Sequence, residues 1–389
     1  RYNDWFNNRN KIEESMKNIL ITGGAGFIGS NLALRLISLG YQVTVLDNLS
    51  PQIHTENSAL YDSIKNKVKF IKGDVRNKQD WVAALEGQDA IVHLAAETGT
   101  GQSMYEIEKY TDVNIKGTAI LLDYLTNETH NIQKVIVASS RAIYGEGKYH
   151  CTQHGDVYPS ERSENDLADN DFEVKCPYCA SDVTLVDTDE ASKIHPSSIY
   201  GITKQNQEQM VMVTCQSLGI PAVAFRYQNV YGPGQSLSNP YTGILSIFST
   251  RIKNNNDLNI FEDGEESRDF VYIDDVVSAT VKGLEQSAAD GEIFNIGSGV
   301  GTTVLTVANA LKQNYQSDIE ITISGNYRVG DIRHNVADLT KAKERLNFEP
   351  KVTFSKGVEQ FTAWVNNQAV EDDCYEDSIS EMKEKGLYK

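Results

Sequence analysis

The chain has 389 residues, which is long enough for one large core or two fused lobes. Apolar residues make up 40% and charged residues 23%, as is typical of a globular enzyme. The formal net charge is −18, from 54 acidic and 36 basic side chains. We therefore expect no nucleic-acid partner and no binding to anionic membranes, since both need a basic surface. A local basic pocket is still compatible with this charge.

Targeting signals are not evident in the sequence. No apolar run approaches the roughly 20 residues that a membrane span requires, and the polar start lacks the apolar stretch of a secretory signal. We assign no function to residues 1–15 and expect a cytoplasmic protein.

Short apolar runs alternate with helical stretches over the first 145 residues. The runs predict strands at Asn18–Thr22, Gln42–Asp47, Val68–Asp74, Ala90–Ala95 and Lys134–Ser140. They are continuously apolar, as parallel strands buried on both faces are. Between the first two, apolar residues at helical spacing predict a helix ending at Gly40, namely Ile28, Leu32, Leu36 and Leu39. This repetition predicts an α/β fold with a doubly wound parallel sheet, the Rossmann fold.

The rest of the chain predicts a division into domains. We expect the Rossmann domain over residues 17–230, with a helix at Tyr200–Leu218, a strand at Ala222–Tyr227 and a cysteine-bearing insertion at 147–195. Residues 231–365 mainly form a smaller substrate-binding lobe, from which a strand near 292–296 returns to the sheet. Residues 366–389 form an acidic tail, as a surface helix or a loosely held segment.

A glycine-rich segment joins the first strand to the first helix. Glycines allow a tight turn and let the backbone approach a pyrophosphate at the helix N-terminus. The segment fits both G-x-G-x-x-G and G-x-x-G-x-x-G, and its position between strand and helix favours dinucleotide binding. The cofactor residues predicted from it are Gly23, Gly26, Phe27, Ile28 and Gly29.

The ends of the next two strands indicate which dinucleotide binds. Asp47 is placed to accept hydrogen bonds from the adenosine ribose and would repel a 2′-phosphate, and Asn48 rather than an arginine follows it. We therefore predict NAD over NADP. Asp74, followed by Val75, is placed either at the adenine edge or as the N-cap of the next helix.

Tyr200 and Lys204 lie one helical turn apart and so share a helix face. A nearby ammonium favours the phenolate, which makes a tyrosine usable as a base near neutral pH. Ser140, at the end of the fifth strand, can hydrogen-bond the oxygen that exchanges its proton. In this order along the chain, the three residues predict a catalytic site.

These motifs resemble the extended short-chain dehydrogenase/reductases, particularly the nucleotide-sugar epimerases and dehydratases, from about Lys17 to about Val365. The resemblance selects Ser140 as the catalytic hydroxyl, because it precedes the Tyr144–Gly145 pair by four residues. It implies that NAD is tightly bound. It also implies further cofactor contacts from the motifs V-N-I-K-G-T, H-L-A-A and F-R-Y-Q-N-V-Y-G-P, at Leu94, Ala95, Ala96, Asn114 and Tyr227.

The resemblance also implies a nucleotide-diphosphate sugar as substrate. Its two diphosphate-binding arginines match Arg268 and Arg328, whose planar guanidinium groups suit phosphate oxygens. Asn229 is expected on the sugar diphosphate. Two residues beside the catalytic groups, Thr98 and Arg141, complete the predicted substrate contacts.

Comparison within this family favours epimerisation at C4. The 4,6-dehydratases place an Asp-Glu pair after the catalytic hydroxyl residue, whereas this chain has Arg141-Ala142. The chain resembles the dTDP-L-rhamnose 4-epimerase-like and UDP-glucose 4-epimerase-like groups through R-Y-Q-N-V-Y-G-P-G-Q-S and the following N-P-Y-T-G. We favour a dTDP-6-deoxyhexose such as dTDP-L-rhamnose. The alternatives are a UDP-glucose or UDP-GlcNAc 4-epimerase, a nucleotide-sugar reductase or dehydrogenase, and, least favoured, a non-catalytic dinucleotide sensor.

Cys151-x-x-His154 and Cys176-x-x-Cys179 in the insertion have the spacing of a structural zinc site with four ligands. His150 competes with His154 as a ligand, and the alternative is a loop with free cysteines. Finally, members of this family often dimerise through a four-helix interface, so we expect a homodimer with the Tyr200 helix as part of it.

Overall fold

The computed structural model describes residues 16–54, 59–241 and 243–389, so residues 1–15, and Thr242 of the N-P-Y-T-G segment, lie outside the described residues. A seven-stranded sheet lies at its centre in the order β13-β9-β5-β4-β1-β2-β3, and every neighbouring pair is parallel. Its strands are β1 (Asn18–Thr22), β2 (Gln42–Asp47), β3 (Lys69–Lys72), β4 (Ala90–His93), β5 (Lys134–Ser140), β9 (Ala222–Tyr227) and β13 (Ile293–Ile296). The predicted doubly wound sheet is confirmed.

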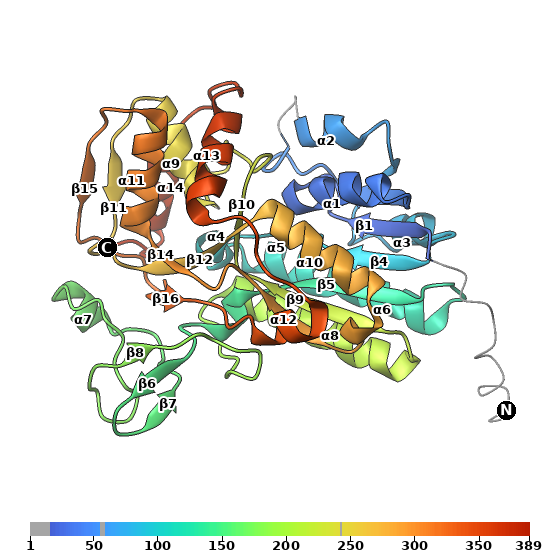
Figure 1. Cartoon of the computed structure of the whole chain (residues 1–389), viewed down its shortest axis with the longest axis horizontal. Helices are drawn as coiled ribbons and strands as arrows, with labels where there is room; N and C mark the ends of the chain where they lie inside the picture. Colours follow the sequence, from blue (N-terminus) through green and yellow to red (C-terminus); the bar gives the residue numbers. More distant parts are fainter. Residues whose placement is uncertain (1–15, 55–58, 242) are drawn as a thin grey trace.

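Helices cover both faces of this sheet (Figure 1) because the strands are apolar on both sides. Ile19 and Ile21 of β1 belong to one hydrophobic cluster, whereas Leu20 belongs to the cluster on the opposite face. The first cluster packs against α1 (Phe27–Ser38), α10 (Ile273–Glu285) and α12 (Thr340–Leu346). The second packs against α3 (Lys78–Leu85), α6 (Gly117–Asn127) and α8 (Ile199–Leu218).

The first helix differs from prediction at its end. Leu32 and Leu36 are buried, but Leu39 is 42% exposed. Helix α1 ends at Ser38, and Gly40 turns the chain with a φ of +92°, so Leu39 lies beyond the last turn that faces the core. The prediction that Leu39 belongs to the buried face of the first helix is therefore wrong.

A second lobe lies at the carboxyl end of the sheet strands (Figure 1). It contains a four-stranded sheet and a two-stranded sheet, made of β10 (Asn229–Tyr231), β12 (Ser267–Tyr272), β14 (Gly301–Thr303), β16 (His334–Asn335), β11 (Leu258–Ile260) and β15 (Ile321–Ile323). Its helices are α9 (Ile244–Lys253), α11 (Val304–Tyr315), α13 (Phe354–Val365) and α14 (Tyr375–Glu384). The chain leaves this lobe through α10 and returns to the central sheet as β13, which pairs with β9.

The cysteine-bearing insertion folds as a small unit that projects from the molecule (Figure 1). Its three-stranded sheet has the order β7-β6-β8, formed by β6 (Tyr149–Cys151), β7 (Gly155–Val157) and β8 (Thr184–Leu185), and α7 (Glu164–Ala168) follows β7 in the chain. Its apolar cluster contains only Tyr149, Val157 and Val174 besides the cysteines and their partly buried neighbours. Such a small core calls for an additional crosslink, as in other small domains.

The acidic tail is not loosely held. It forms α14, and Ser378, Ile379 and Met382 are buried on its inner face. Tyr375, Ile379 and Met382 recur at helical spacing, so an apolar stripe is hidden within an acidic composition. Among the described residues, no helix is both long and apolar enough to cross a bilayer.

Candidate active site

A cavity of about 550 Å³ lies where the carboxyl ends of the sheet strands meet the second lobe. Ligands bind at this edge in open α/β sheets. Of the cofactor and substrate residues predicted from the sequence, all except Asn114 line this cavity. The fold therefore brings both predicted groups of residues to one site.

The glycine turn between β1 and α1 has no room for side chains. Gly23 has a φ of +65°, and a Cβ atom there would lie 2.9 Å from the Cα atom of Ala95. A Cβ atom on Gly29 would lie 2.4 Å from the carbonyl oxygen of Gly23. The N-cap, Gly26, brings no side chain to the first amides of α1, which leaves them open to a pyrophosphate. This cradle fits a dinucleotide.

Asp47 is fixed at the end of β2 by two backbone amides. Ala25 N–H donates to its Oδ2 atom at 3.0 Å and Leu49 N–H to its Oδ1 atom at 2.8 Å. The carboxylate is buried and faces the cavity. A 2′-phosphate beside it would meet a fixed negative charge, which favours NAD.

Asp74 is not the N-cap of the following helix, because Asn77 accepts the capping hydrogen bond from Gln79 N–H. Asp74 instead lines the cavity and accepts hydrogen bonds from Arg76 at 2.7 and 2.9 Å. These bonds lower the pKa of Asp74 to about 2. Asn48 also donates to it at 3.3 Å, so the Asn48–Asp74 pair forms part of the cavity wall.

A buried chain of polar groups extends from Lys204 to the first strand. Lys204 Nζ donates to Gln207 at 2.8 Å, and Gln207 donates to Thr118 at 2.9 Å. His93 then contacts Thr118 through Nε2 at 2.9 Å and Thr22 through Nδ1 at 2.7 Å. Burial, together with the charge of Lys204, lowers the pKa of His93 to about 3, so the imidazole is neutral.

Burial acts in opposite directions on Tyr200 and Lys204, the two groups of α8 that the sequence predicts to be catalytic. It lowers the pKa of Lys204 to about 7 and raises the pKa of the Tyr200 phenol. The Ser140 side chain and the charge of Arg141 lower the pKa of Tyr200 in part. Ser140 sits at the end of β5, where its hydroxyl accepts a hydrogen bond from Ala142 N–H at 3.1 Å. Ser140 and Arg141 therefore act against burial, in the direction that makes Tyr200 a better base.

The opposite end of the cavity is basic. Arg268 and Arg328 each contact one oxygen of Asp331 at 3.1 Å. Although burial raises the pKa of Asp331, the surrounding arginines outweigh it and hold that pKa at about 2; they are Arg328, Arg268, Arg162 and Arg141. Arg141 also donates to Asn229 at 3.2 Å. Three of these guanidinium groups, those of Arg141, Arg268 and Arg328, line the cavity and suit an anion with several phosphate oxygens.

Asn114, for which the resemblance implies a cofactor contact, lies beside the cavity but does not line it. It is fully buried in a π-helical turn, Thr111–Lys116, behind the cavity wall. Its side chain accepts from Glu97 N–H at 2.8 Å and donates to Thr203 at 2.9 Å. Asn114 therefore joins the loop after β4 to the catalytic helix α8, and it positions the site without lining it.

The insertion brings its four predicted ligands together. Ligand atoms of Cys151, His154, Cys176 and Cys179 all lie within 4.8 Å of one another. The Sγ atoms of Cys151 and Cys179 are 3.8 Å apart, and His154 Nδ1 lies 3.5 Å from the Sγ atom of Cys151. His150 instead contacts Asp156 at 3.2 Å on the exposed side of the sheet. Of the two candidate histidines, His154 belongs to the cluster.

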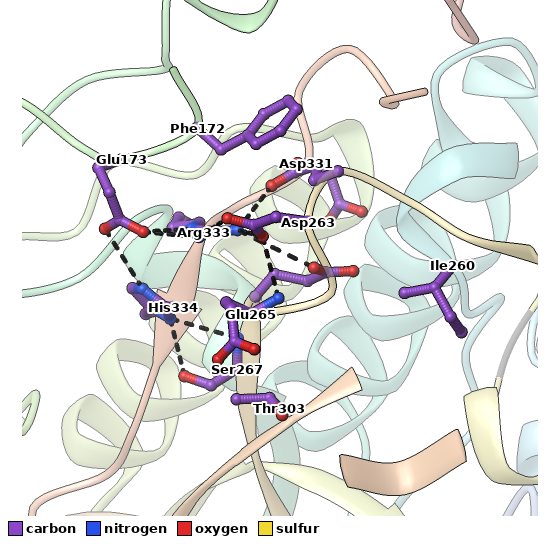
Figure 2. A network of polar contacts seen from close by, with 12 residues as sticks. Phe172, Glu173, Ile260, Asp263, Glu265, Ser267, Thr303, Asp331, Arg333 and His334 are labelled. Carbon is purple, nitrogen blue, oxygen red and sulfur yellow. Dashed lines mark hydrogen bonds and ion pairs between the residues drawn. The ribbon is translucent and has the colours of Figure 1, made fainter. Parts of the chain in front are cut away.

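An ionic network joins the insertion to the arginine end of the cavity (Figure 2). Arg333 is 1% exposed and contacts Glu173 of the insertion at 2.6 Å and Asp263 of the lobe at 2.7 Å. Arg162 of the insertion contacts Glu262 at 2.7 Å and donates to the carbonyl oxygen of Asp331 at 2.9 Å. Sequence analysis did not find Asp331 or this network. The one available signal was an acidic residue three positions after Arg328.

The fold and the shared face of Tyr200 and Lys204 define an extended short-chain dehydrogenase/reductase. Comparison with protein families matches residues 19–165 and 175–297 to the NAD dependent epimerase/dehydratase family, and the chain belongs to this family. The gap in the match lies within the insertion. The family resemblance inferred from the sequence, and the expectation of an enzyme, are confirmed.

Similar proteins include several nucleotide-sugar epimerases. The chain is 36% identical over 353 residues to dTDP-L-rhamnose 4-epimerase of Burkholderia thailandensis, which covers 90% of this chain and 95% of the relative. A crystal structure of UDP-glucose 4-epimerase from Thermotoga maritima with UDP-glucose superposes with a TM-score of 0.73 at 31% identity, covering 90% and 98% of the two chains. UDP-glucuronic acid 4-epimerase from Bacillus cereus, in complex with UDP-glucuronic acid and NAD, has a TM-score of 0.71 at 27% identity and covers 90% and 99%.

Replacing Asp331 by asparagine should destabilise the fold by about 2 kcal/mol at pH 7, because Arg268 and Arg328 lose their shared anion. The pKa of Asp331 is lower in the folded chain than its ordinary value, so its charge stabilises the fold above that ordinary value. This stabilisation disappears as the pH falls towards 2. The difference between Asp331→Asn and the parent should therefore shrink from about pH 5 to about pH 3 in urea unfolding.

The matched control is Asp182→Asn, since Asp182 is 89% exposed and pairs only with Lys175 among the ion pairs of the described residues. It should change stability by less than about 0.5 kcal/mol at either pH. An Asp331→Asn protein as stable as the parent at pH 7 would contradict the role given to this carboxylate.

Proposed function

We propose that this enzyme is an NAD-dependent nucleotide-sugar 4-epimerase, acting on a dTDP-6-deoxyhexose such as dTDP-L-rhamnose. The observation that supports it best is the cavity itself, which joins the Tyr200–Lys204 face at one end to the Arg268–Arg328 pair at the other. A diphosphate held by the arginines places a sugar towards the tyrosine. The 36% identity to a dTDP-L-rhamnose 4-epimerase favours the proposed sugar nucleotide.

The residues of the chain have separate roles in this reaction. The glycine turn would hold NAD, which would supply the acceptor and donor of the C4 hydride. Tyr200 removes the proton of the C4 hydroxyl as the C4 ketone forms, and Ser140 hydrogen-bonds that oxygen. Lys204, buried one turn along α8, stabilises the phenolate. The 4-keto sugar rotates while the arginines hold the diphosphate. Tyr200 returns its proton to the oxygen when the C4 ketone is reduced on its opposite face. The cycle leaves NAD unchanged, so tight binding of the cofactor belongs to the proposal.

An NMR assay of the purified protein without added cofactor tests this proposal. We expect conversion of dTDP-L-rhamnose to its C4 epimer, and extraction of the denatured protein should release about one NAD per chain. Conversion of UDP-glucose or UDP-GlcNAc instead would show that the proposed substrate is wrong and the proposed reaction is right. Stoichiometric consumption of added NAD or NADH without an epimer would indicate a dehydrogenase or reductase.

Tyr200→Phe should lower kcat by about 100- to 10,000-fold, because it removes the acid–base group and keeps the ring that packs near Tyr110. Nucleotide-sugar affinity should change little in calorimetry. Tyr178→Phe, on a side chain 74% exposed in the insertion, is the control. Unchanged turnover in Tyr200→Phe would disprove the proposed mechanism.

We further propose a structural zinc ion at Cys151, His154, Cys176 and Cys179. Sulfur atoms about 2.3 Å from a tetrahedral zinc lie about 3.8 Å apart. The separation of 3.8 Å between Cys151 and Cys179 fits that geometry. The four ligands leave no position for water, so the ion would crosslink the small core of the insertion. Thiolate ligands need a reducing compartment, which agrees with a cytoplasmic location.

Metal analysis tests the zinc proposal. The parent protein should contain about one zinc per chain and Cys176→Ser nearly none, with a lower melting temperature. Cys374→Ser, at an exposed cysteine of the tail, should keep both unchanged. A parent protein purified without chelator that contains no zinc and binds none on titration would refute the site.

A homodimer through α8 is the remaining proposal. Ile202 and Val213 are 41% and 66% exposed, and they are three helical turns apart and so share the outer face of α8. A second copy would bury these two exposed apolar side chains of α8, the helix against which α6 packs.

Light scattering of Val213→Asp should show a monomer where the parent is a dimer, because the substitution buries an unpaired charge in the interface. Val370→Asp, at another exposed valine, should stay dimeric. A monomeric parent would overturn the proposal.

A further inference from the structure

The tail contributes directly to the wall of the nucleotide-sugar cavity. Four of its side chains line the cavity: Tyr375, Ser378, Ile379 and Met382. Ile379 and Met382 are 5% and 6% exposed, so the apolar face of α14 is turned inwards. The cavity is therefore bounded by a segment that lies outside both the Rossmann sheet and the sheets of the lobe.

One end of α14 is held beside the catalytic helix. A Cβ atom added to Gly101 of α4 (Thr100–Ser103) would lie 3.7 Å from the Sδ atom of Met382. The neighbouring Ser103 accepts a hydrogen bond from Tyr200 N–H at 3.0 Å. The last turn of α14 therefore lies near the first turn of the catalytic helix.

A single carboxylate joins this end of α14 both to the Rossmann domain and to the second lobe. Glu381 accepts hydrogen bonds from Tyr105, in the link between α4 and α5 (Ile107–Tyr110), at 3.1 Å and from Tyr241 of the lobe at 2.6 Å. Burial and the Glu381 charge raise the pKa values of both tyrosines, so both hydroxyl groups stay protonated donors. Opening the cavity on this side requires these two bonds to break.

The residues that flank α14 on both sides are held against the second lobe. Arg251 of α9 contacts Asp373 at 3.3 Å, and its guanidinium lies 4.5 Å from the centre of the Tyr375 ring. Beyond α14, Val329 N–H donates to the carbonyl oxygen of Leu387 at 3.0 Å, next to Arg328. The tail thus extends along the cavity from the arginine end to the catalytic end.

We propose that α14 is the retaining wall of the substrate cavity, where Ile379 and Met382 contact the bound nucleotide sugar and Glu381 keeps the wall closed. This inference rests on the proposed epimerase function. During the catalytic cycle the 4-keto sugar must rotate, so that its other face meets the cofactor, without leaving the enzyme. Once the C4–H bond has been broken and the hydride transferred to NAD, loss of the ketone leaves reduced cofactor behind. A wall that spans both ends of the cavity prevents this loss.

Glu381→Ala removes the acceptor of both tyrosine bonds and tests the proposal in the full-length holoenzyme. During turnover, absorbance at 340 nm should rise at least several-fold faster than in the parent, with matching loss of activity, because the 4-keto sugar escapes. The affinity for dTDP and UDP in calorimetry should fall several-fold. Glu384→Ala, an exposed glutamate on the outer face of the same helix, should match the parent in both measurements.

Two further variants keep the test decisive. Tyr241→Phe keeps the ring but removes the hydroxyl group that donates to Glu381. If Glu381→Ala does not fold, Tyr241→Phe should show the same effect. Adding Tyr200→Phe to Glu381→Ala should abolish the rise at 340 nm, because no oxidation occurs. Parental nucleotide affinity and no rise at 340 nm in both tail variants would overturn the inference. A parent that epimerises none of the sugars refutes the proposed function instead, and the nucleotide affinities then decide the role of α14.

Discussion

The Asp331 carboxylate holds the arginine end of the site together. Guanidinium groups stay charged in proteins, so several of them facing one cavity repel one another unless an anion lies between them. Asp331 is that anion, with Arg268 on one oxygen and Arg328 on the other. The segment that contains Asp331 also contacts the insertion, through Arg162, and the tail, through Leu387. The segment around Asp331 therefore joins four parts of the chain, two through the carboxylate and two through its backbone.

The catalytic end is organised in the opposite way. Its polar groups are joined by hydrogen bonds into a buried chain, from Lys204 through Gln207 to His93, whose imidazole is neutral. Burial there lowers the pKa of Lys204 to about 7, whereas the arginines at the other end hold Asp331 ionised. One end of the cavity thus carries fixed charges and the other carries buried groups with shifted pKa values, and the proposed substrate, with a diphosphate and a sugar hydroxyl, matches this division.

Local spacing explains why much of the site was predictable from the sequence. The glycine turn, the Tyr200–Lys204 pair and the Cys-x-x-His and Cys-x-x-Cys pairs are each contained in a few consecutive residues, where chain geometry determines which side chains meet. Asn114 was identified by resemblance, but its partners, Glu97 and Thr203, come from other elements. The central sheet was predictable because most of its strands are buried on both faces and largely apolar; the exception is the edge strand β3, whose Lys69 and Lys72 are exposed.

Long-range contacts and mixed composition hid the rest. Nothing near Glu173 in the sequence indicates that it faces Arg333, because the insertion and the lobe meet only after folding (Figure 2). The tail contains many acidic residues, and these masked the three apolar positions by which α14 joins the cavity wall. The many acidic residues of such a helix lie on its outer face, so overall composition reflects that face. The inner face is recognised only from the spacing of a few apolar residues.

The return of β13 to the central sheet affects how the chain is assembled. During synthesis β9 emerges with one edge unpaired, and its partner, beginning at Ile293, follows only after most of the second lobe has been made. Exposed strand edges are sites of mispairing and aggregation. Folding of the nucleotide-binding half cannot be completed by the ribosome-bound N-terminal portion alone. A chain truncated before Ile293 would retain the glycine turn and the catalytic helix yet present an open sheet edge, which makes it a substrate for chaperones rather than an independent domain.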